Sequence, residues 1–137
     1  MFVTADQLFC HAMGDYVLQS HWMATEKTRQ SWAALCHAVT YTAPFVCLSQ
    51  SPLALAVICL THFVIDRWRL ARFVVWWKNL VFAPRHVANE IMDDTLTNGV
   101  SPTGFPTDTH AWLSVWLLII VDNILHIAIN ALALKYL

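Results

Sequence analysis

Charged residues are scarce in this sequence, since Lys, Arg, Asp and Glu together make up 12% of its 137 residues. A soluble domain is nearer a quarter charged, whereas 58% of the residues here are hydrophobic, so the composition favours an integral membrane protein. Only three glycines and five prolines are present, and this shortage of turn residues argues against a sheet-rich fold. The length suits a single domain, which we assign to residues 1–137.

Other absences exclude further classes of protein. No basic run alternates with aromatic residues, so we expect no nucleic-acid-binding surface. The cysteines form no Cys-x-x-Cys pair and lie in apolar segments, which favours buried free thiols over disulfides or zinc ligands; they are Cys10, Cys36, Cys47 and Cys59. The N-terminal stretch MFVTADQ lacks a basic region and a small-residue cleavage site, so no cleaved signal peptide is expected.

Four apolar segments predict an all-α fold, which we expect to be a membrane-embedded four-helix bundle. They cover residues of about 3–20, 31–50, 53–67 and 110–134. A helix needs roughly 20 residues to cross the bilayer core, so the first and third segments are expected to tilt or lean on their neighbours. The turn SQSP at residues 49–52 predicts that the second and third helices form an antiparallel hairpin.

The connection between the third and fourth helices, residues 68–109, is long. It begins with RLARFVVWWKNLVF, and this basic, tryptophan-rich composition predicts an interfacial amphipathic helix over about 70–83. A soluble amphipathic helix is the alternative for the same residues. Glycine and proline residues further along predict an irregular loop over about 95–109.

The basic residues predict the orientation in the membrane. In a four-span topology seven of the eight lie on one side, and only Lys135 lies opposite. Positive charge marks the cytoplasmic side, so we expect a multi-pass protein with both termini outside the cytoplasm. The seven cytoplasmic residues are Lys27, Arg29, Arg67, Arg69, Arg72, Lys78 and Arg85.

Three aspartates inside the predicted spans each lie four residues from a histidine. The pairs are His11 with Asp15, His62 with Asp66, and Asp122 with His126. Side chains four residues apart share one face of a helix, so three helices each present a His–Asp pair. His37 adds a further imidazole from the second helix. Counted from the predicted cytoplasmic ends, these residues can form one layer.

A buried metal explains this layer. An ionised aspartate in hydrocarbon costs about 3 kcal/mol, and a divalent cation compensates for that cost. Imidazole nitrogen and carboxylate oxygen suit Zn²⁺, with Mn²⁺, Fe²⁺ and Co²⁺ as alternatives. The layer can hold one or two divalent ions. Two are favoured because their positive charge balances the negative charge of three aspartates and a bridging hydroxide. The predicted ligands are His11, Asp15, His37, His62, Asp66, Asp122 and His126. Hydrogen bonding within the pairs, and a proton or ion relay, are the alternatives.

Three stretches resemble a family of small bacterial and phage membrane proteins, the domain of unknown function 3307. They are LFCHAMGDYVLQSHWMATEKTRQSWAALCHAVTY, THFVIDRW, and PTGFP followed by WLSVWLLIIVDNILHIAIN. The pattern of the family falls on His11, Gly14, Asp15, Leu18, Gln19, His37, His62 and Asp66. The resemblance implies a bacterial inner-membrane location, a shared fold and a shared site, but no activity. The His–Asp pairs also resemble those of membrane-bound metal-dependent hydrolases and of zinc amidases of the ceramidase type, although the ligand order differs from the ceramidase pattern.

The sequence therefore predicts a membrane-embedded metal-dependent hydrolase. A metal-bound water is acidified toward a pKa of about 7, and Asp15 or Asp66 can serve as the base. The expected substrate is lipidic or a small molecule that reaches the bilayer, with a phosphoester, amide or ester bond left unranked. Two alternatives stay open: a metal- or proton-binding or transport protein, and a non-catalytic phage or bacterial membrane protein that acts through a host partner. A homo-oligomer is compatible with each of these functions.

Overall fold

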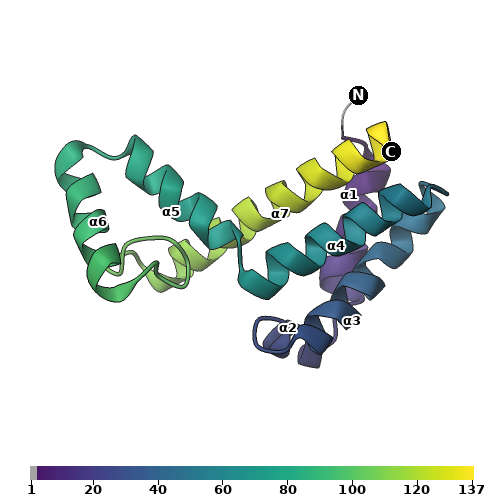
Figure 1. Cartoon of the computed structure of the whole chain (residues 1–137), viewed down its shortest axis with the longest axis horizontal. Helices are drawn as coiled ribbons and strands as arrows, with labels where there is room; N and C mark the ends of the chain where they lie inside the picture. Colours follow the sequence, from purple (N-terminus) through teal and green to yellow (C-terminus); the bar gives the residue numbers. More distant parts are fainter. Residues whose placement is uncertain (1–2) are drawn as a thin grey trace. The chain divides into compact units, whose positions relative to one another are not determined.

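The structure is a computed structural model that describes residues 3–137, so Met1 and Phe2 of the predicted domain lie outside the described residues. These described residues form helices and no strands, which confirms the all-α prediction. The helical elements, shown in Figure 1, are α1 (Ala5–Ala12), the π-helix η1 (Met13–Val17), α2 (His21–Glu26), α3 (Ser31–Thr42), the 3-10 helix η2 (Ala43–Cys47), α4 (Pro52–Trp68), α5 (Ala71–Phe82), α6 (Arg85–Asn98) and α7 (Ala111–Tyr136).

The chain divides into two compact units, and each is described by itself. The first contains the described residues up to Arg69 together with Ile124–Leu137, and the second contains Leu70–Asn123. Residues of α7 from Ile124 onward therefore belong to the first unit. The assignment of residues 1–137 to one domain stays a prediction.

Local capping interactions determine where helices of the first unit begin and end. The side chains of Thr4 and Gln7 form a capping box, in which each accepts a hydrogen bond from the backbone N–H of the other, at 3.3 and 3.1 Å. Ser51 begins α4 because its Oγ accepts the N–H of Ala54 at 3.3 Å. Arg69 ends α4 in the left-handed conformation, with φ of 51°.

The core of the first unit is built from segments far apart in the sequence. Helices α3 and α4 contact each other along the predicted hairpin and lie side by side in Figure 1. Tyr41, Phe45 and Ile58 are completely buried between them, and Cys10 from α1 and Ala133 from α7 join the same cluster. This shared core packs α1, α3 with η2, α4 and α7 together, and side chains from these separate segments can therefore meet.

The predicted first helix over about 3–20 is wrong in its last part. The backbone changes from α to π geometry at Met13 and the π-helix ends at Val17. A second short helix, α2, then occupies the predicted connection, where Ser20 Oγ caps it by accepting the N–H of Met23 at 3.3 Å.

The second unit contains α5 where the interfacial helix was predicted over about 70–83, and its place at a membrane surface stays a prediction. Helix α6 extends to Asn98, so the irregular loop begins later than the predicted residue 95. The indole of Trp76 on α5 donates a hydrogen bond to Thr95 Oγ1 on α6 at 3.0 Å. The side-chain amide of Asn79 on α5 donates a hydrogen bond to the carbonyl of Gly104 at 3.2 Å, which connects the loop after α6 to α5.

Among the described residues, α7 is the one helix long and apolar enough to cross a membrane. Its 26 residues span about 39 Å. Helix α3 has 12 residues and α4 has 17, both below the roughly 20 residues that cross a bilayer core unaided. The four-span membrane bundle therefore stays a prediction.

Candidate metal centre

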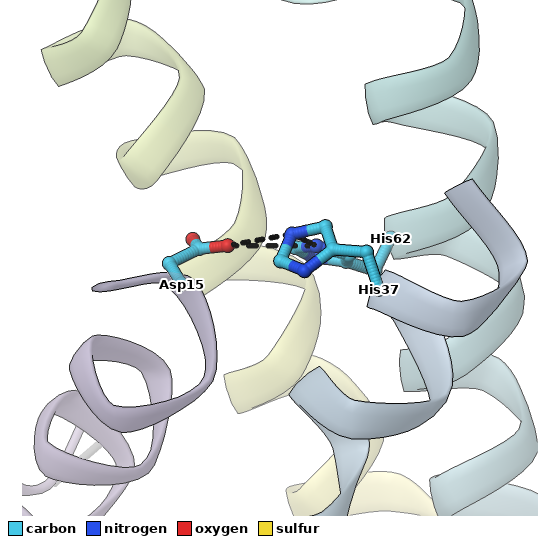
Figure 2. Close-up of side chains that lie close together, drawn as sticks. All are labelled: Asp15, His37 and His62. Carbon is cyan, nitrogen blue, oxygen red and sulfur yellow. Dashed lines mark hydrogen bonds and ion pairs between the residues drawn. The ribbon is translucent and has the colours of Figure 1, made fainter. Parts of the chain in front are cut away.

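Four side-chain atoms converge inside the first unit: Asp15 Oδ1, His37 Nε2, His62 Nε2 and Asp66 Oδ2. The two Nε2 atoms are 3.0 Å apart. Asp15 Oδ1 lies 3.3 Å from the nitrogen of His37 and 3.5 Å from that of His62. Asp66 Oδ2 lies 3.2 Å from each of the same nitrogens. Figure 2 shows the Asp15 carboxylate facing both imidazoles, which come from separate helices.

The cluster is shielded from solvent. The side chains of His37, His62 and Asp66 are 0%, 1% and 4% exposed, and that of Asp15 is 11% exposed. Buried polar groups need partners, and buried carboxylates need compensating charge. Asp15 is the most accessible member, so water reaches the cluster most readily from its side.

These contacts cannot all be hydrogen bonds at once. Each imidazole nitrogen carries either one hydrogen or one lone pair, so it forms one strong hydrogen bond. His37 Nε2 has the three other cluster atoms within 3.3 Å and the side-chain amide of Gln19 at 3.1 Å. A cation at the centre would be bound by several of these lone pairs at once. The Nδ1 atoms of His37 and His62 are buried and have no hydrogen-bond partner among the described residues.

The π-helix η1 determines where Asp15 points. In a regular α-helix Asp15 would stack on His11, one turn earlier. The wider π turn over Met13–Val17 leaves a separation of 3.5 Å between His11 Nδ1 and Asp15 Oδ2, while Asp15 Oδ1 faces the two imidazoles. Such π segments occur frequently at functional sites.

Gly14 allows η1 to approach α3 closely. A Cβ atom at this position would lie 2.6 Å from Tyr41 Cδ2 and 2.8 Å from the Tyr41 carbonyl oxygen, which is closer than any side chain tolerates. Glycine is therefore required beside Asp15 because the backbone of η1 runs directly against the backbone of α3.

His126 from α7 extends the cluster. Its ring centroid lies 4.2 Å from that of His62, and its Nε2 is 3.8 Å from Asp66 Oδ1. Two groups of ligand-type side chains result, and both contain His62; they are Asp15, His37 and His62, and His62, Asp66 and His126.

The structure brings together most of the predicted ligands, although metal binding by them stays a prediction. Asp15, His37, His62, Asp66 and His126 belong to these two groups. His11 lies beside them, 4% exposed, with its Nδ1 bonded to the hydroxyl of Tyr41 at 2.8 Å. Asp122 lies one turn before His126 on α7 and belongs to neither of the two groups found among residues 3–137.

Tyr41 is a member of the site that sequence reasoning missed. Its ring stacks on His62 with a centroid distance of 3.6 Å and an interplanar angle of 15°. Its hydroxyl accepts a hydrogen bond from Asn130 Nδ2 at 2.6 Å and contacts His11 at 2.8 Å. Tyr41 follows His37 by four residues, so the same helical spacing that paired the histidines and aspartates could have identified it.

Lys27 is the second member that sequence reasoning missed. Its Nζ lies 2.8 Å from Asp66 Oδ2, and its side chain is 20% exposed. The sequence assigned Lys27 to a cytoplasmic connection on charge alone, and no local pattern relates it to an aspartate 39 residues later. Only the folded chain shows that this lysine reaches the cluster.

We expect Tyr41→Phe to lower the stability by about 1–3 kcal/mol while metal affinity stays within about threefold of wild type. The hydroxyl is lost, so His11 and Asn130 lose a buried partner, whereas the ring that stacks on His62 remains. Thermal unfolding and metal titration in detergent measure the two effects. Tyr136→Phe, at a tyrosine that is 66% exposed, is the matched control. Equal stability of Tyr41→Phe and wild type would contradict a structural role for the hydroxyl.

The fold and the cluster define an all-helical protein with a buried group of histidine and aspartate side chains drawn from four separate segments. Residues 3–136 match the family described as Protein of unknown function (DUF3307), and the chain belongs to this family. The match covers nearly the whole chain and confirms the resemblance found in the sequence. No curated protein and no solved structure matches the chain.

Proposed function

We propose that this chain is a membrane-embedded hydrolase in which a divalent ion, held by His37, His62 and Asp66 with Asp15 beside them, activates water. The spacing of the cluster supports this proposal. Ligand atoms at the usual bond lengths around a tetrahedral zinc ion lie about 3.3 Å from one another. The three proposed ligand atoms, His37 Nε2, His62 Nε2 and Asp66 Oδ2, lie 3.0–3.2 Å from one another. Asp15 Oδ1 lies 3.3 and 3.5 Å from the two nitrogens.

One ion suits the arrangement better than two. Both ligand groups contain His62, and the contacts to Asp15 and Asp66 involve the same Nε2 atom. One nitrogen lone pair binds one ion, so the two groups describe a single centre. The charge of a divalent ion is balanced by Asp15 and Asp66 when the histidines are neutral. Zn²⁺ fits this ligand set first, and Mn²⁺, Fe²⁺ and Co²⁺ follow.

The outer surface of the first unit supports a membrane location. Large apolar side chains face outward on three of its helices while the polar cluster is buried inside. They include Trp32 and Val39 on α3, Leu53, Leu60 and Val64 on α4, and Ile124 and Leu132 on α7. Exposed apolar surface of this extent marks a site of contact with lipid or protein. We infer four spans, formed by α1 with η1, α3 with η2, α4, and α7, in a bacterial inner membrane, with α5 at the interface and both termini outside the cytoplasm.

The proposed chemistry is direct hydrolysis by water. Asp15 is placed to accept a proton from water because it is the most accessible carboxylate of the cluster, and a divalent ion held by His37, His62 and Asp66 would supply the acidification of that water. The water oxygen then bonds to the phosphorus or carbonyl carbon of the substrate. The proton held by Asp15 passes to the oxygen or nitrogen that leaves, which returns the site to its starting state.

We expect Asp15→Asn to retain one bound ion and to lose at least about 100-fold in hydrolytic rate, because an amide cannot accept the proton of water. The measurement compares zinc-loaded wild type and variant in detergent on phosphodiester, ester and amide substrates. Asp6→Asn is the matched control, since Asp6 is an exposed residue of α1. Hydrolysis by Asp15→Asn at the rate of wild type would contradict the proposed role.

A structural metal site is the second candidate, and one observation favours it. Structural zinc sites have four protein ligands, and four protein atoms converge here, whereas catalytic sites usually keep one position for water. The ion would then join η1, α3 and α4. In this case chelation would unfold the protein, no substrate class would be hydrolysed, and Asp15→Asn would lower the unfolding temperature instead of a rate.

A further inference from the structure

Lys27 brings a positive charge to a site whose aspartates already balance a divalent ion. It follows α2 directly, and its Nζ lies 2.8 Å from Asp66 Oδ2. Gln19 contacts the same ammonium: with its side-chain oxygen toward Lys27, that oxygen accepts from Nζ at 2.8 Å and lies 3.1 Å from His37 Nε2. Lys27 is therefore linked to both a carboxylate and an imidazole of the cluster.

The backbone around Lys27 is fixed in place. The guanidinium of Arg67 donates from Nη1 to the carbonyl of Thr28 at 2.6 Å and from Nε to Ser31 Oγ at 3.2 Å. The N–H of Lys27 donates to the carbonyl of Met23 at 3.0 Å. These bonds attach the α2–α3 connection to the end of α4, next to Asp66, so the position of the Lys27 backbone is a property of the fold.

A metal ion and Lys27 compete for the same oxygen atom. An ion bound to Asp66 Oδ2 repels an ammonium at 2.8 Å from that atom, because two like charges at such a distance repel strongly at low dielectric. The long side chain of Lys27 is 20% exposed and flexible, so it can turn toward the open side while Gln19 still accepts from it.

The charge of the loaded site then favours an anion. A divalent ion contributes +2, Asp15 and Asp66 contribute −2, neutral histidines contribute nothing, and Lys27 contributes +1. We propose, on the basis of the proposed function, that Lys27 binds a negatively charged group next to the scissile bond, and that the substrate is an anionic ester of the phosphodiester class. A neutral amide or ester leaves the excess charge uncompensated, whereas a phosphodiester carries one negative charge and balances it.

Binding of inorganic phosphate tests this role of Lys27. Zinc-loaded wild type in detergent should bind phosphate, and Lys27→Met should bind it about 10- to 100-fold more weakly, since a charge-assisted hydrogen bond is lost. Lys27→Arg should restore most of the affinity because it keeps the charge. Lys78→Met is the matched control, because Lys78 lies over the ring of Phe105 in the second unit. Phosphate affinity of Lys27→Met equal to that of wild type would overturn the proposal.

Hydrolysis distinguishes the two sources of such a substrate. A phospholipid in mixed micelles and a soluble aryl phosphodiester are compared, and cleavage of either one, with KM raised at least about tenfold in Lys27→Met and kcat less affected, supports the proposal. Cleavage of neutral esters in preference to both would overturn it. The zinc content of the purified protein distinguishes failure of the metal centre from failure of the role of Lys27. A wild type that binds no metal refutes the metal centre. A zinc-loaded Lys27→Met with the phosphate affinity of wild type refutes only the role of Lys27.

Discussion

His62→Ala should abolish stoichiometric metal binding. Wild type purified in detergent and supplied with zinc is expected to hold one ion per chain, and the variant should lose at least about 100-fold in affinity. This exceeds the 10- to 100-fold loss that follows removal of a group outside the ligand sphere. The reason is geometric, because His62 Nε2 contacts His37 Nε2 and both aspartate carboxylates and is the member common to both ligand groups.

Elemental analysis and competition with a chromophoric chelator measure this effect. His21→Ala is the matched control, since His21 is an exposed histidine on α2 and belongs to neither ligand group of the described residues. His37→Ala should behave like His62→Ala, because its Nε2 makes the same contacts. A wild type that stays free of metal after zinc supply would refute the centre and leave a network of hydrogen bonds and ion pairs.

Gly14→Ala should destabilise the protein by about 3 kcal/mol, among the larger effects of a single methyl group in a packed interior. The added Cβ would meet the Tyr41 side chain at 2.6 Å, and it would also meet the carbonyl oxygen and Cα of Tyr41 at 2.8 and 3.0 Å. Because two of these contacts are to backbone atoms, a change of the Tyr41 rotamer cannot relieve them. The backbone of η1, which carries Asp15, must therefore move away from α3.

Thermal unfolding in detergent measures the loss, and the hydrolytic rate should fall with it because Asp15, the proposed base, moves away from His37. Gly99→Ala is the comparison variant. Its φ of 78° with ψ of 177° suits glycine alone, so about 1–3 kcal/mol of backbone strain is expected, but a Cβ there meets no atom within 4 Å and Asp15 should not move. Equal stability of Gly14→Ala and wild type would show that η1 does not lie against α3 as described.

Much of the candidate site follows from spacing along single helices. His62 and Asp66 lie one turn apart on α4, and the contact of 3.2 Å between them is what an α-helix produces from that spacing. His11 and Asp15 have the same spacing and lie 3.5 Å apart, while the other oxygen of Asp15 faces His37 and His62. The spacing rule therefore identified both pairs, but it did not reveal the further contacts of Asp15, which the π-helix and the packing of η1 determine.

The partners that the sequence did not reveal are those that depend on tertiary packing. Lys27 reaches Asp66 because α2 and the following connection fold back onto α4, held by Arg67. Asp122 has the spacing of a ligand on α7, yet neither ligand group includes it. Periodicity places a residue on a face of its own helix and carries no information about which other helix that face will meet.

The amino-acid sequence by itself determined that the chain is helical, where most helices lie, and which histidines and aspartates share a face, because these properties arise from apolar periodicity and capping within a few residues. The tertiary structure decided which of those side chains meet in one cluster, and it added Tyr41 and Lys27. Contacts between segments tens of residues apart depend on the packing of α1, α3, α4 and α7 around a shared core, and periodicity within one helix does not determine that packing.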